Sequence, residues 1–411
     1  MNIYISGISG TGMGPLAIMA KNAGHFVMGS DLNKGPIVDE LDAAGIEYKI
    51  GEQDGEFLKQ KNAENKIDWF VYTSALPENH PELLAAKELG IKTSKRDELI
   101  AYLVKELNLK MVAVAGTHGK TTTTSMIIWA AKQLNLPVSY LVGTTLGFAK
   151  SGSYDKEDKF FVYEADEYDR NFLHFFPWLS LVTFVSYDHP DIYKTEEDYK
   201  NAFEQFKSQS ESVINGGEID DRFNLAGKAR REDATTAKKA IEKICESLGR
   251  EITEEEIIRV LNDFPGVGRR FERIADGVYS DYAHHPEEIA ATIEMANEEA
   301  LRTGKRGVAA VYEPHQNTRQ HEVKDGYKSA FNGAEVLYWL PTYLTREDKS
   351  LAVISPSEFI ESLDHPEIGE PAEMNDDLKN ELIDLRKEGY LILLMTAGPA
   401  DTWLRQVFNM V

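Results

Sequence analysis

The clearest chemical pattern in the chain is the segment Gly116-Thr117-His118-Gly119-Lys120-Thr121-Thr122, which follows the apolar run Met111 to Ala115 and opens a helix-like segment. Backbone N–H groups in such a turn surround phosphate oxygens, and the dipole of the following helix favours negative charge. Lys120 supplies a positive charge for the β- and γ-phosphates, and the Thr121 hydroxyl can ligate Mg²⁺. Because Val114 stands where the usual P-loop has its first glycine, we predict a variant phosphate loop. The alternative is a strand-to-helix turn that merely ends in Gly-Lys-Thr.

Polar clusters also follow two later apolar runs. Glu164-Ala165-Asp166-Glu167 comes after Phe160 to Tyr163, and Asp188-His189 comes after Leu179 to Val185. A carboxylate at the end of a strand can hold Mg²⁺ directly or through water, and an imidazole can bind a metal or a phosphate. Taken singly, each cluster is more simply a solvated surface or a turn. Because the carboxyl ends of parallel strands meet at one edge of a sheet, we predict that four side chains converge there: Lys120, Thr121, Glu164 and His189.

A second glycine-rich segment, Gly7-Ile8-Ser9-Gly10-Thr11-Gly12-Met13-Gly14, follows the apolar start of the chain. Its glycines allow a backbone to approach a diphosphate, and Asp31 stands 24 residues after Gly7, where a ribose hydroxyl would be bound. The spacing is Gly-x-x-Gly-x-Gly and differs from that of dinucleotide folds. An NAD-dependent oxidoreductase therefore remains as an alternative, beside a protein that binds another nucleotide diphosphate.

Short apolar runs alternate with amphipathic segments along the whole chain, which predicts parallel sheets covered by helices. The pattern starts three times, so we expect three consecutive α/β domains, at residues 1–107, 108–264 and 265–411. The segment Thr253-Glu254-Glu255-Glu256 predicts a helix start. The predicted strands are residues 3–6, 26–29, 69–73, 111–115, 138–142, 160–164, 179–185, 308–312, 336–340 and 391–396, with one more that begins near Val278.

Composition sets the class of protein. With 411 residues, 42% hydrophobic and 27% charged, the chain has the composition of a folded protein. A formal net charge of −23 disfavours nucleic acid as a partner. Cys245 is the only cysteine, which excludes an intramolecular disulfide and fits the cytoplasm. We find no uncharged run long enough to span a membrane and expect no membrane association. The oligomeric state is left open.

In this order, the motifs of the chain resemble those of the Mur ligases, ATP-dependent enzymes that build the peptide of bacterial peptidoglycan. The resemblance implies a Rossmann-like first domain for the UDP substrate, a central P-loop domain for ATP and a Rossmann-like third domain for the incoming amino acid. It is greatest to the members that join L-alanine to UDP-N-acetylmuramate. The segments that carry it are 7–13, 116–122, 164–167, 172–174, 188–189, Gly268-Arg269-Arg270-Phe271, Asp281-Tyr282-Ala283-His284-His285-Pro286 and 397–403.

The resemblance also implies a role for each matching residue, with ATP and Mg²⁺ as cofactors. Catalysis would rest on Lys120, Glu164, His189 and Arg270, and Mg²⁺ on Thr121, Glu164 and His189. ATP would be bound by Gly116, Thr117, His118, Gly119, Lys120, Thr121, Thr122, Asn224, Arg270 and Asp281. The UDP substrate would be held by Gly10, Thr11, Gly12, Asp31 and Ser74, and the amino acid by Tyr282, His284, His315 and Arg319. The implied reaction passes through an acyl phosphate.

Some positions depart from the pattern of the family. The central domain is shortened, because Asn215-Gly216-Gly217 is followed almost directly by Arg222-Phe223-Asn224. Gln316 replaces an arginine of the alanine-adding members. Glu313, Asn317 and the segment Glu164 to Tyr168 are more similar to the recycling ligases that attach a whole tripeptide to UDP-N-acetylmuramate. A tripeptide-adding ligase and a non-catalytic nucleotide-binding relative are therefore the further hypotheses.

Overall fold

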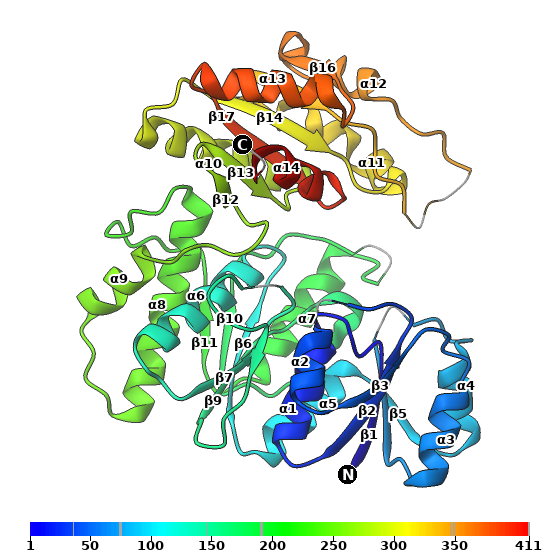
Figure 1. The fold of residues 1–411 in the computed structure, drawn as a ribbon. Coiled ribbons are helices and arrows are strands. Elements are labelled where there is room, and N and C mark those ends of the chain that lie inside the picture. The colour runs from blue at the N-terminus through cyan, green and yellow to red at the C-terminus, as the bar shows by residue number, and fades with distance from the viewer. Residues whose placement is uncertain are drawn as a thin grey trace. The chain divides into compact units, whose positions relative to one another are not determined.

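The chain folds as an α/β protein with three mostly parallel sheets (Figure 1). The computed structural model describes residues 1–35, 37–73, 76–144, 146–189, 192–345, 347 and 350–409. The prediction of three α/β units is confirmed by these sheets. By its internal packing the chain forms two compact units, one of residues 1–223 and 232–265, the other of residues 224–231 and 266–411. The domain boundaries 1–107, 108–264 and 265–411 stay a prediction.

The first sheet has the strand order β3-β2-β1-β4-β5, and every pair in it is parallel. One face packs on α3 and α4 around Tyr4 and Phe70, and the other packs on α1 and α5 around Ile3 and Ile5. The elements are β1 (Asn2–Ser6), α1 (Gly14–Asn22), β2 (Phe26–Asp31), α2 (Val38–Ala43), β3 (Glu47–Ile50), α3 (Glu56–Glu64), β4 (Trp69–Tyr72), α4 (Pro81–Glu88), β5 (Lys92–Lys95) and α5 (Arg96–Glu106).

The second sheet has the order β11-β10-β6-β9-β7-β8, so β6 lies between β9 and β10. All pairs are parallel except that of β7 with β8. The segments that follow β6, β9 and β10 therefore start at the same edge. The elements are β6 (Lys110–Ala115), α6 (Lys120–Gln133), β7 (Val138–Leu141), β8 (Gly152–Ser153), β9 (Phe160–Glu164), η1 (Tyr168–His174), β10 (Leu179–Val182), α7 (Glu196–Ser208), β11 (Val213–Asn215), α8 (Lys228–Leu248) and α9 (Glu254–Asn262).

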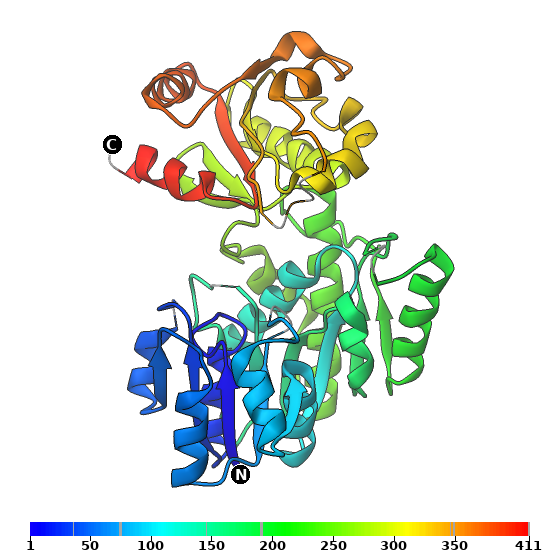
Figure 2. The same ribbon diagram turned by 90° about the vertical axis from the view of Figure 1, so that its right-hand side faces the viewer.

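The third sheet has the order β12-β13-β17-β14-β15-β16, with only β12 antiparallel to its neighbour. Figure 2 shows α10 and α11 on one face and α13 and α14 on the other, and a separate apolar cluster fills each side. The elements are β12 (Glu272–Ala275), β13 (Val278–Asp281), α10 (Pro286–Thr303), β14 (Val308–Glu313), α11 (Asn317–Val323), η2 (Lys324–Ser329), β15 (Val336–Trp339), α12 (Pro356–Ile360), η3 (Pro366–Ile368), β16 (Gly369–Pro371), α13 (Asp376–Lys387), β17 (Leu391–Thr396) and α14 (Ala400–Asn409). Among the described helices, none is both long and apolar enough to cross a membrane.

The helix start predicted at Thr253 is confirmed. The Thr253 Oγ1 accepts a hydrogen bond from the Glu256 backbone N–H at 3.2 Å, and the helix buries Ile257 and Leu261. Replacing Thr253 by alanine leaves that donor without its cap, so we expect the free energy of unfolding to fall by about 1 kcal/mol. Urea denaturation measures the change. Thr253→Ser keeps the hydroxyl and is the control; an equal loss in both variants would contradict the capping role.

Candidate active site

The loop between β6 and α6 has a backbone that requires glycine at two positions. Gly116 has φ of 143° and Gly119 has φ of 82°. A β-carbon on Gly116 would lie 2.1 Å from the Thr183 Oγ1, and one on Gly119 would lie 2.4 Å from the Asp233 Oδ1. Helix α6 begins directly after Gly119 without a side-chain cap. Its first-turn amides are therefore available to an anion, as the sequence predicts.

The rest of this loop is held by the segment after β10. The Thr117 N–H donates to the Phe184 carbonyl at 2.6 Å, and its hydroxyl lies 2.7 Å from the Ser186 carbonyl oxygen. The His118 ring stacks on that of Phe184, with centroids 5.8 Å apart. Thr122 is half-buried in the first turn of α6. Two strand ends thus fix the shape of the predicted phosphate loop together.

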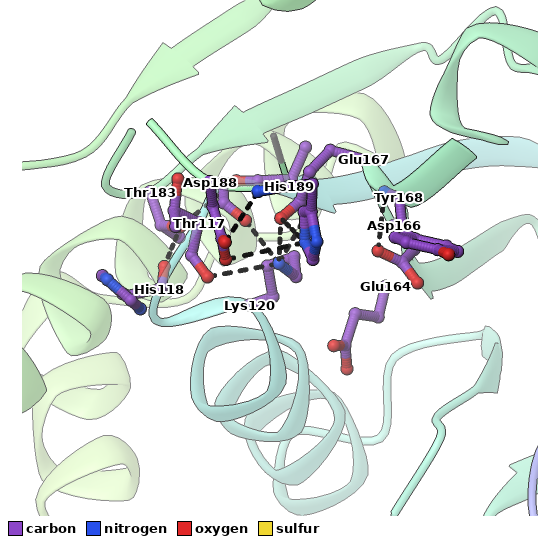
Figure 3. Close-up of polar contacts among 12 residues, drawn as sticks. Thr117, His118, Lys120, Glu164, Asp166, Glu167, Tyr168, Thr183, Asp188 and His189 are labelled. Atoms are coloured by element: carbon purple, nitrogen blue, oxygen red, sulfur yellow. Dashed lines mark hydrogen bonds and ion pairs between the residues drawn. The ribbon is translucent and has the colours of Figure 1, made fainter. Parts of the chain in front are cut away.

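Lys120 forms a buried ion pair with Glu167 (Figure 3). The Lys120 Nζ donates to both Glu167 carboxylate oxygens, at 2.8 and 3.0 Å, and to the Gly116 carbonyl at 2.6 Å. The Glu167 side chain is only 1% exposed. Burial acts to raise the Glu167 pKa, but the Lys120 charge outweighs it and the pKa lies below its usual range. Burial likewise acts to lower the Lys120 pKa, which Glu167 holds above its usual range.

His189 lies on the other side of the same carboxylate. Its Nε2 is 3.7 Å from the Glu167 Oε1 and 3.6 Å from the Asp188 Oδ2. Although burial acts to lower the His189 pKa, these two carboxylates outweigh it and raise the pKa. The backbone of His189 is left-handed, with φ of 57°. Strand β10 ends at Val182, before the predicted end at Val185, and this irregular segment carries His189 to Glu167.

Glu164, at the end of β9, points away from the Lys120 cluster in Figure 3. The Thr121 hydroxyl donates to its carboxylate, with both oxygens at 3.0 Å. The structure therefore brings together the four side chains predicted to converge, as a Thr121–Glu164 pair beside the Lys120–Glu167–His189 cluster.

The first glycine loop contacts the predicted Asp31. The Asp31 Oδ2 accepts from the Ser9 N–H at 2.9 Å, and a tight turn joins the Gly10 N–H to the Gly7 carbonyl at 3.2 Å. Gly10, Thr11 and Gly12 lie between β1 and α1, at the carboxyl edge of the first sheet. This is the edge where α/β sheets bind nucleotides. Ser74 lies outside the described residues.

In the second compact unit, Arg270 and Asp281 are neighbours of Tyr282. The Arg270 guanidinium lies over the Tyr282 ring, 4.7 Å from its centroid. Buried Asp281 accepts from the backbone N–H groups of Phe271 at 2.6 Å and Ala283 at 2.7 Å. Burial raises the Asp281 pKa, although the Arg270 charge opposes the shift.

The predicted amino-acid residues lie near one another in this unit. The His284 and His315 rings have centroids 6.2 Å apart, and Tyr343 stacks on His315 at 5.9 Å. Burial lowers the His284 pKa, and Arg319 of α11 acts in the same direction.

Asn224 belongs to a short segment, residues 224–231, that packs with the C-terminal unit. In it the Gly227 N–H donates to Glu298 at 2.8 Å, and Arg231 pairs with the same carboxylate at 2.8 Å. Gly227 has φ of 86°, a left-handed conformation that favours glycine over residues with a side chain.

Comparison with known proteins shows the family of the chain. Residues 2–107 match the catalytic domain of the Mur ligase family, and residues 114–256 match the Mur ligase middle domain. The UDP-N-acetylmuramate–L-alanine ligase of Clostridium botulinum is 30% identical, in an alignment covering 97% of this chain and 95% of that protein. The chain belongs to the Mur ligase family. It is therefore an ATP-dependent ligase that forms an amide bond, as the sequence predicts.

Solved structures share the fold of this Mur ligase. The UDP-N-acetylmuramate–alanine ligase of Thermotoga maritima matches with a TM-score of 0.75 and 21% identity, covering 100% of this chain and 99% of that one. A murein peptide ligase of Psychrobacter arcticus matches with a TM-score of 0.60 and 22% identity, and the match covers 100% of this chain and 98% of that one. The alignment with the Clostridium protein spans 448 positions, more than the 411 residues here, so that protein has segments that this Mur ligase lacks.

The residues of this Mur ligase fit a magnesium ion only together with a substrate. Within the described residues, no three His, Cys, Asp or Glu side chains are grouped to hold a metal ion by themselves. Thr121 and Glu164 offer hydroxyl and carboxylate oxygens side by side. Mg²⁺ in phosphate sites uses one or two such ligands, substrate phosphates and water. The donor set therefore fits Mg²⁺, whereas His189 faces Glu167.

The sequence did not single out Glu167. It lies in the acidic cluster, but the residue types give no reason to prefer it to Glu164, Asp166 or Asp169. The structure makes it the counterion of Lys120 and the neighbour of His189. The signal that could have identified it is physical, since a buried lysine requires a buried carboxylate.

Proposed function

We propose that this Mur ligase acts in the cytoplasm and joins the amino group of L-alanine to the carboxyl group of UDP-N-acetylmuramate, with ATP converted to ADP and phosphate, in peptidoglycan synthesis. The observation that carries the proposal is that three strand ends meet beside an uncapped helix start, where Lys120 and His189 flank Glu167 and Glu164 pairs with Thr121. The name of the 30% identical relative supports the choice of substrates.

In the first step a carboxylate oxygen of the sugar nucleotide attacks the γ-phosphorus of ATP, giving an acyl phosphate and ADP. Negative charge grows on the transferred oxygens, where the Lys120 charge and the first-turn amides of α6 stabilise it. Glu167 holds Lys120 in place and keeps it protonated. Magnesium, held by Thr121 and Glu164, would neutralise further phosphate charge when bound.

In the second step the ammonium group of L-alanine loses a proton to solvent, and the amine nitrogen attacks the acyl carbon. The tetrahedral intermediate then expels phosphate, and the nitrogen loses its second proton to solvent to give the amide. We assign the amino acid to Tyr282, His284, His315 and Arg319. The buried environment of His284 favours the neutral imidazole, which does not repel an ammonium group. We assign the γ-phosphate to Arg270, the ribose to Asp281 and the adenine to Asn224.

The UDP group is assigned to the first sheet. Gly10, Thr11 and Gly12 offer backbone close to the edge where a diphosphate binds, and Asp31 is next to them through Ser9. Ser74 follows β4 in the sequence and is proposed on the resemblance alone.

A tripeptide in place of L-alanine is the second candidate. Glu313 is 2% exposed and accepts hydrogen bonds from the Thr396 hydroxyl and the Ala400 N–H. These bonds hold its carboxylate in place at the carboxyl edge of the third sheet. Asn317 is also buried, at the start of α11. These are two of the positions at which the sequence is more similar to the tripeptide-adding ligases.

Phosphate release distinguishes the two. The protein is incubated with ATP, Mg²⁺, UDP-N-acetylmuramate and either L-alanine or a peptidoglycan tripeptide. We expect release that requires both UDP-N-acetylmuramate and L-alanine. Release only with the tripeptide would replace the first proposal by the second, and ATP binding without release in every mixture would favour a non-catalytic relative. Omitting the sugar nucleotide is the control for background hydrolysis.

A further inference from the structure

Arg96 carries a positive charge whose nearest carboxylate in the protein is too distant for a hydrogen bond. It is the first residue of α5, directly after β5, and its side chain is 27% exposed. Its closest carboxylate oxygen belongs to Asp97, at 3.7 Å, and within the described residues no hydrogen bond involves its guanidinium. By contrast, Arg170 donates two hydrogen bonds to Asp198, at 2.6 and 2.7 Å. A guanidinium has five N–H donors, so a half-buried one without acceptors is prepared for an anion.

The guanidinium of Arg96 lies against the first glycine loop. A β-carbon on Gly12 would be 2.7 Å from the Arg96 Nη1, so the absence of a side chain at Gly12 leaves room for the arginine. The N–H donors of the guanidinium therefore lie beside the backbone of the glycine loop, which a diphosphate can approach. Both features lie at the carboxyl edge of the first sheet.

On its other side Arg96 faces the carboxylates of the second sheet. Its guanidinium is 5.9 Å from the Tyr163 ring centroid, and the charges of Asp166 and Glu164 act on it. Neither carboxylate is within ion-pair distance. Arg96 therefore contacts the glycine loop directly and the acidic cluster only through space.

We propose that Arg96 binds the diphosphate of the UDP substrate, opposite Gly12. The inference rests on the proposed function, since it takes the sugar nucleotide as the ligand of the first sheet. A planar guanidinium donates two parallel hydrogen bonds to phosphate oxygens, which a single backbone amide cannot do. The diphosphate is favoured over the muramyl carboxylate because the direct contact of Arg96 is with Gly12.

Binding of UDP and of UDP-N-acetylmuramate to Arg96→Gln, measured by isothermal titration calorimetry, tests the proposal. UDP has the diphosphate but no muramyl carboxylate. We expect both dissociation constants to rise by about 10- to 100-fold, with ATP affinity unchanged. Arg96→Lys keeps the positive charge but not the two parallel N–H donors, so its dissociation constants should lie between those of the wild type and of Arg96→Gln. Arg250→Gln removes the same charge at an exposed position of the same unit and should bind as the wild type does.

Each outcome decides a different question. Unchanged UDP affinity in a folded Arg96→Gln protein, checked by circular dichroism, would overturn the proposal. A loss confined to UDP-N-acetylmuramate would overturn the assignment to the diphosphate and point to the carboxylate. A wild type that binds neither nucleotide would refute the proposed function, and the inference with it. If Arg96→Gln does not fold, Arg96→Lys measures the loss of the two parallel hydrogen bonds, and unchanged UDP affinity in a folded Arg96→Lys protein would overturn the proposal.

Discussion

Lys120→Ala is expected to reduce the rate of phosphate release by at least about 100- to 1,000-fold, equivalent to roughly 3–4 kcal/mol of transition-state stabilisation. The Lys120 ammonium lies at the start of α6, next to the amides that surround a phosphate, and Glu167 keeps it charged. Removing it leaves the growing charge of the transferred phosphoryl group without its fixed cation. Single-turnover measurement with saturating substrates separates this effect on chemistry from an effect on ATP binding.

The control must separate lost chemistry from lost folding, because the same change leaves Glu167 buried without its cation. Lys132→Ala removes an exposed lysine from the other end of α6 and should keep near-normal turnover. The double variant Lys120→Ala/Glu167→Gln removes the unpaired charge and should recover stability but not activity. Turnover of the single variant within tenfold of the wild type would refute the role of the loop.

The central strands of each sheet were predictable because they are buried on both faces. Runs such as 111–115 and 391–395 are continuously apolar, and residues that cannot face water leave few alternatives to a parallel sheet. The edge strands β3 and β5 have the sequences EYKI and KTSK, with polar side chains at most positions. A strand with one neighbour has no apolar requirement, so its pattern is that of a loop and the sequence prediction omits it.

It was predictable that the strand ends of the site would meet, but not which side chains would pair with one another there. Adjacent parallel strands must present their ends at one edge, which is why Glu164 and the segment containing His189 meet the phosphate loop. After Glu164 the chain leaves the strand, and residues 165–167 have no regular secondary structure. This irregular path decides that Glu167 faces Lys120, and no periodic pattern encodes it.

The two compact units do not coincide with the three sheets, and the reason lies in packing. A single apolar cluster joins the first and second sheets, from Ile3 and Leu103 to Met111 and Phe161. The sequence shows that these residues are apolar but not that they share one core. Likewise, residues 224–231 precede α8 residues that belong to the other unit, and their attachment to Glu298 depends on a contact 67 to 71 residues away in the chain.

Glu167→Gln is expected to lower the free energy of unfolding by about 3 kcal/mol at pH 7. The amide has nearly the same shape, so the change removes a charge rather than a packing contact. Breaking a buried pair by neutralising one partner costs about 3–5 kcal/mol because the other charge stays buried and uncompensated. The lower end is expected here, since the amide oxygen can still accept a hydrogen bond from Lys120. Chemical denaturation monitored by circular dichroism measures the difference.

The dependence of this difference on pH identifies its cause. The Glu167 pKa is depressed in the folded protein from an ordinary value of 4.5, so its contribution is complete above that value and is lost as pH falls through the folded pKa. The Lys120 pKa is raised from 10.5, so its contribution is complete below 10.5 and is lost as pH rises through the folded pKa. The difference in the free energy of unfolding between the wild type and Glu167→Gln should therefore be constant between about pH 5 and 10 and become smaller below pH 4.5. Glu246→Gln breaks an exposed pair with Lys243 and is the control, because a solvent-screened pair contributes little and the stability should stay close to that of the wild type. A gap in Glu167→Gln that stayed the same down to pH 3 would mean that packing, and not charge, holds Glu167 in place.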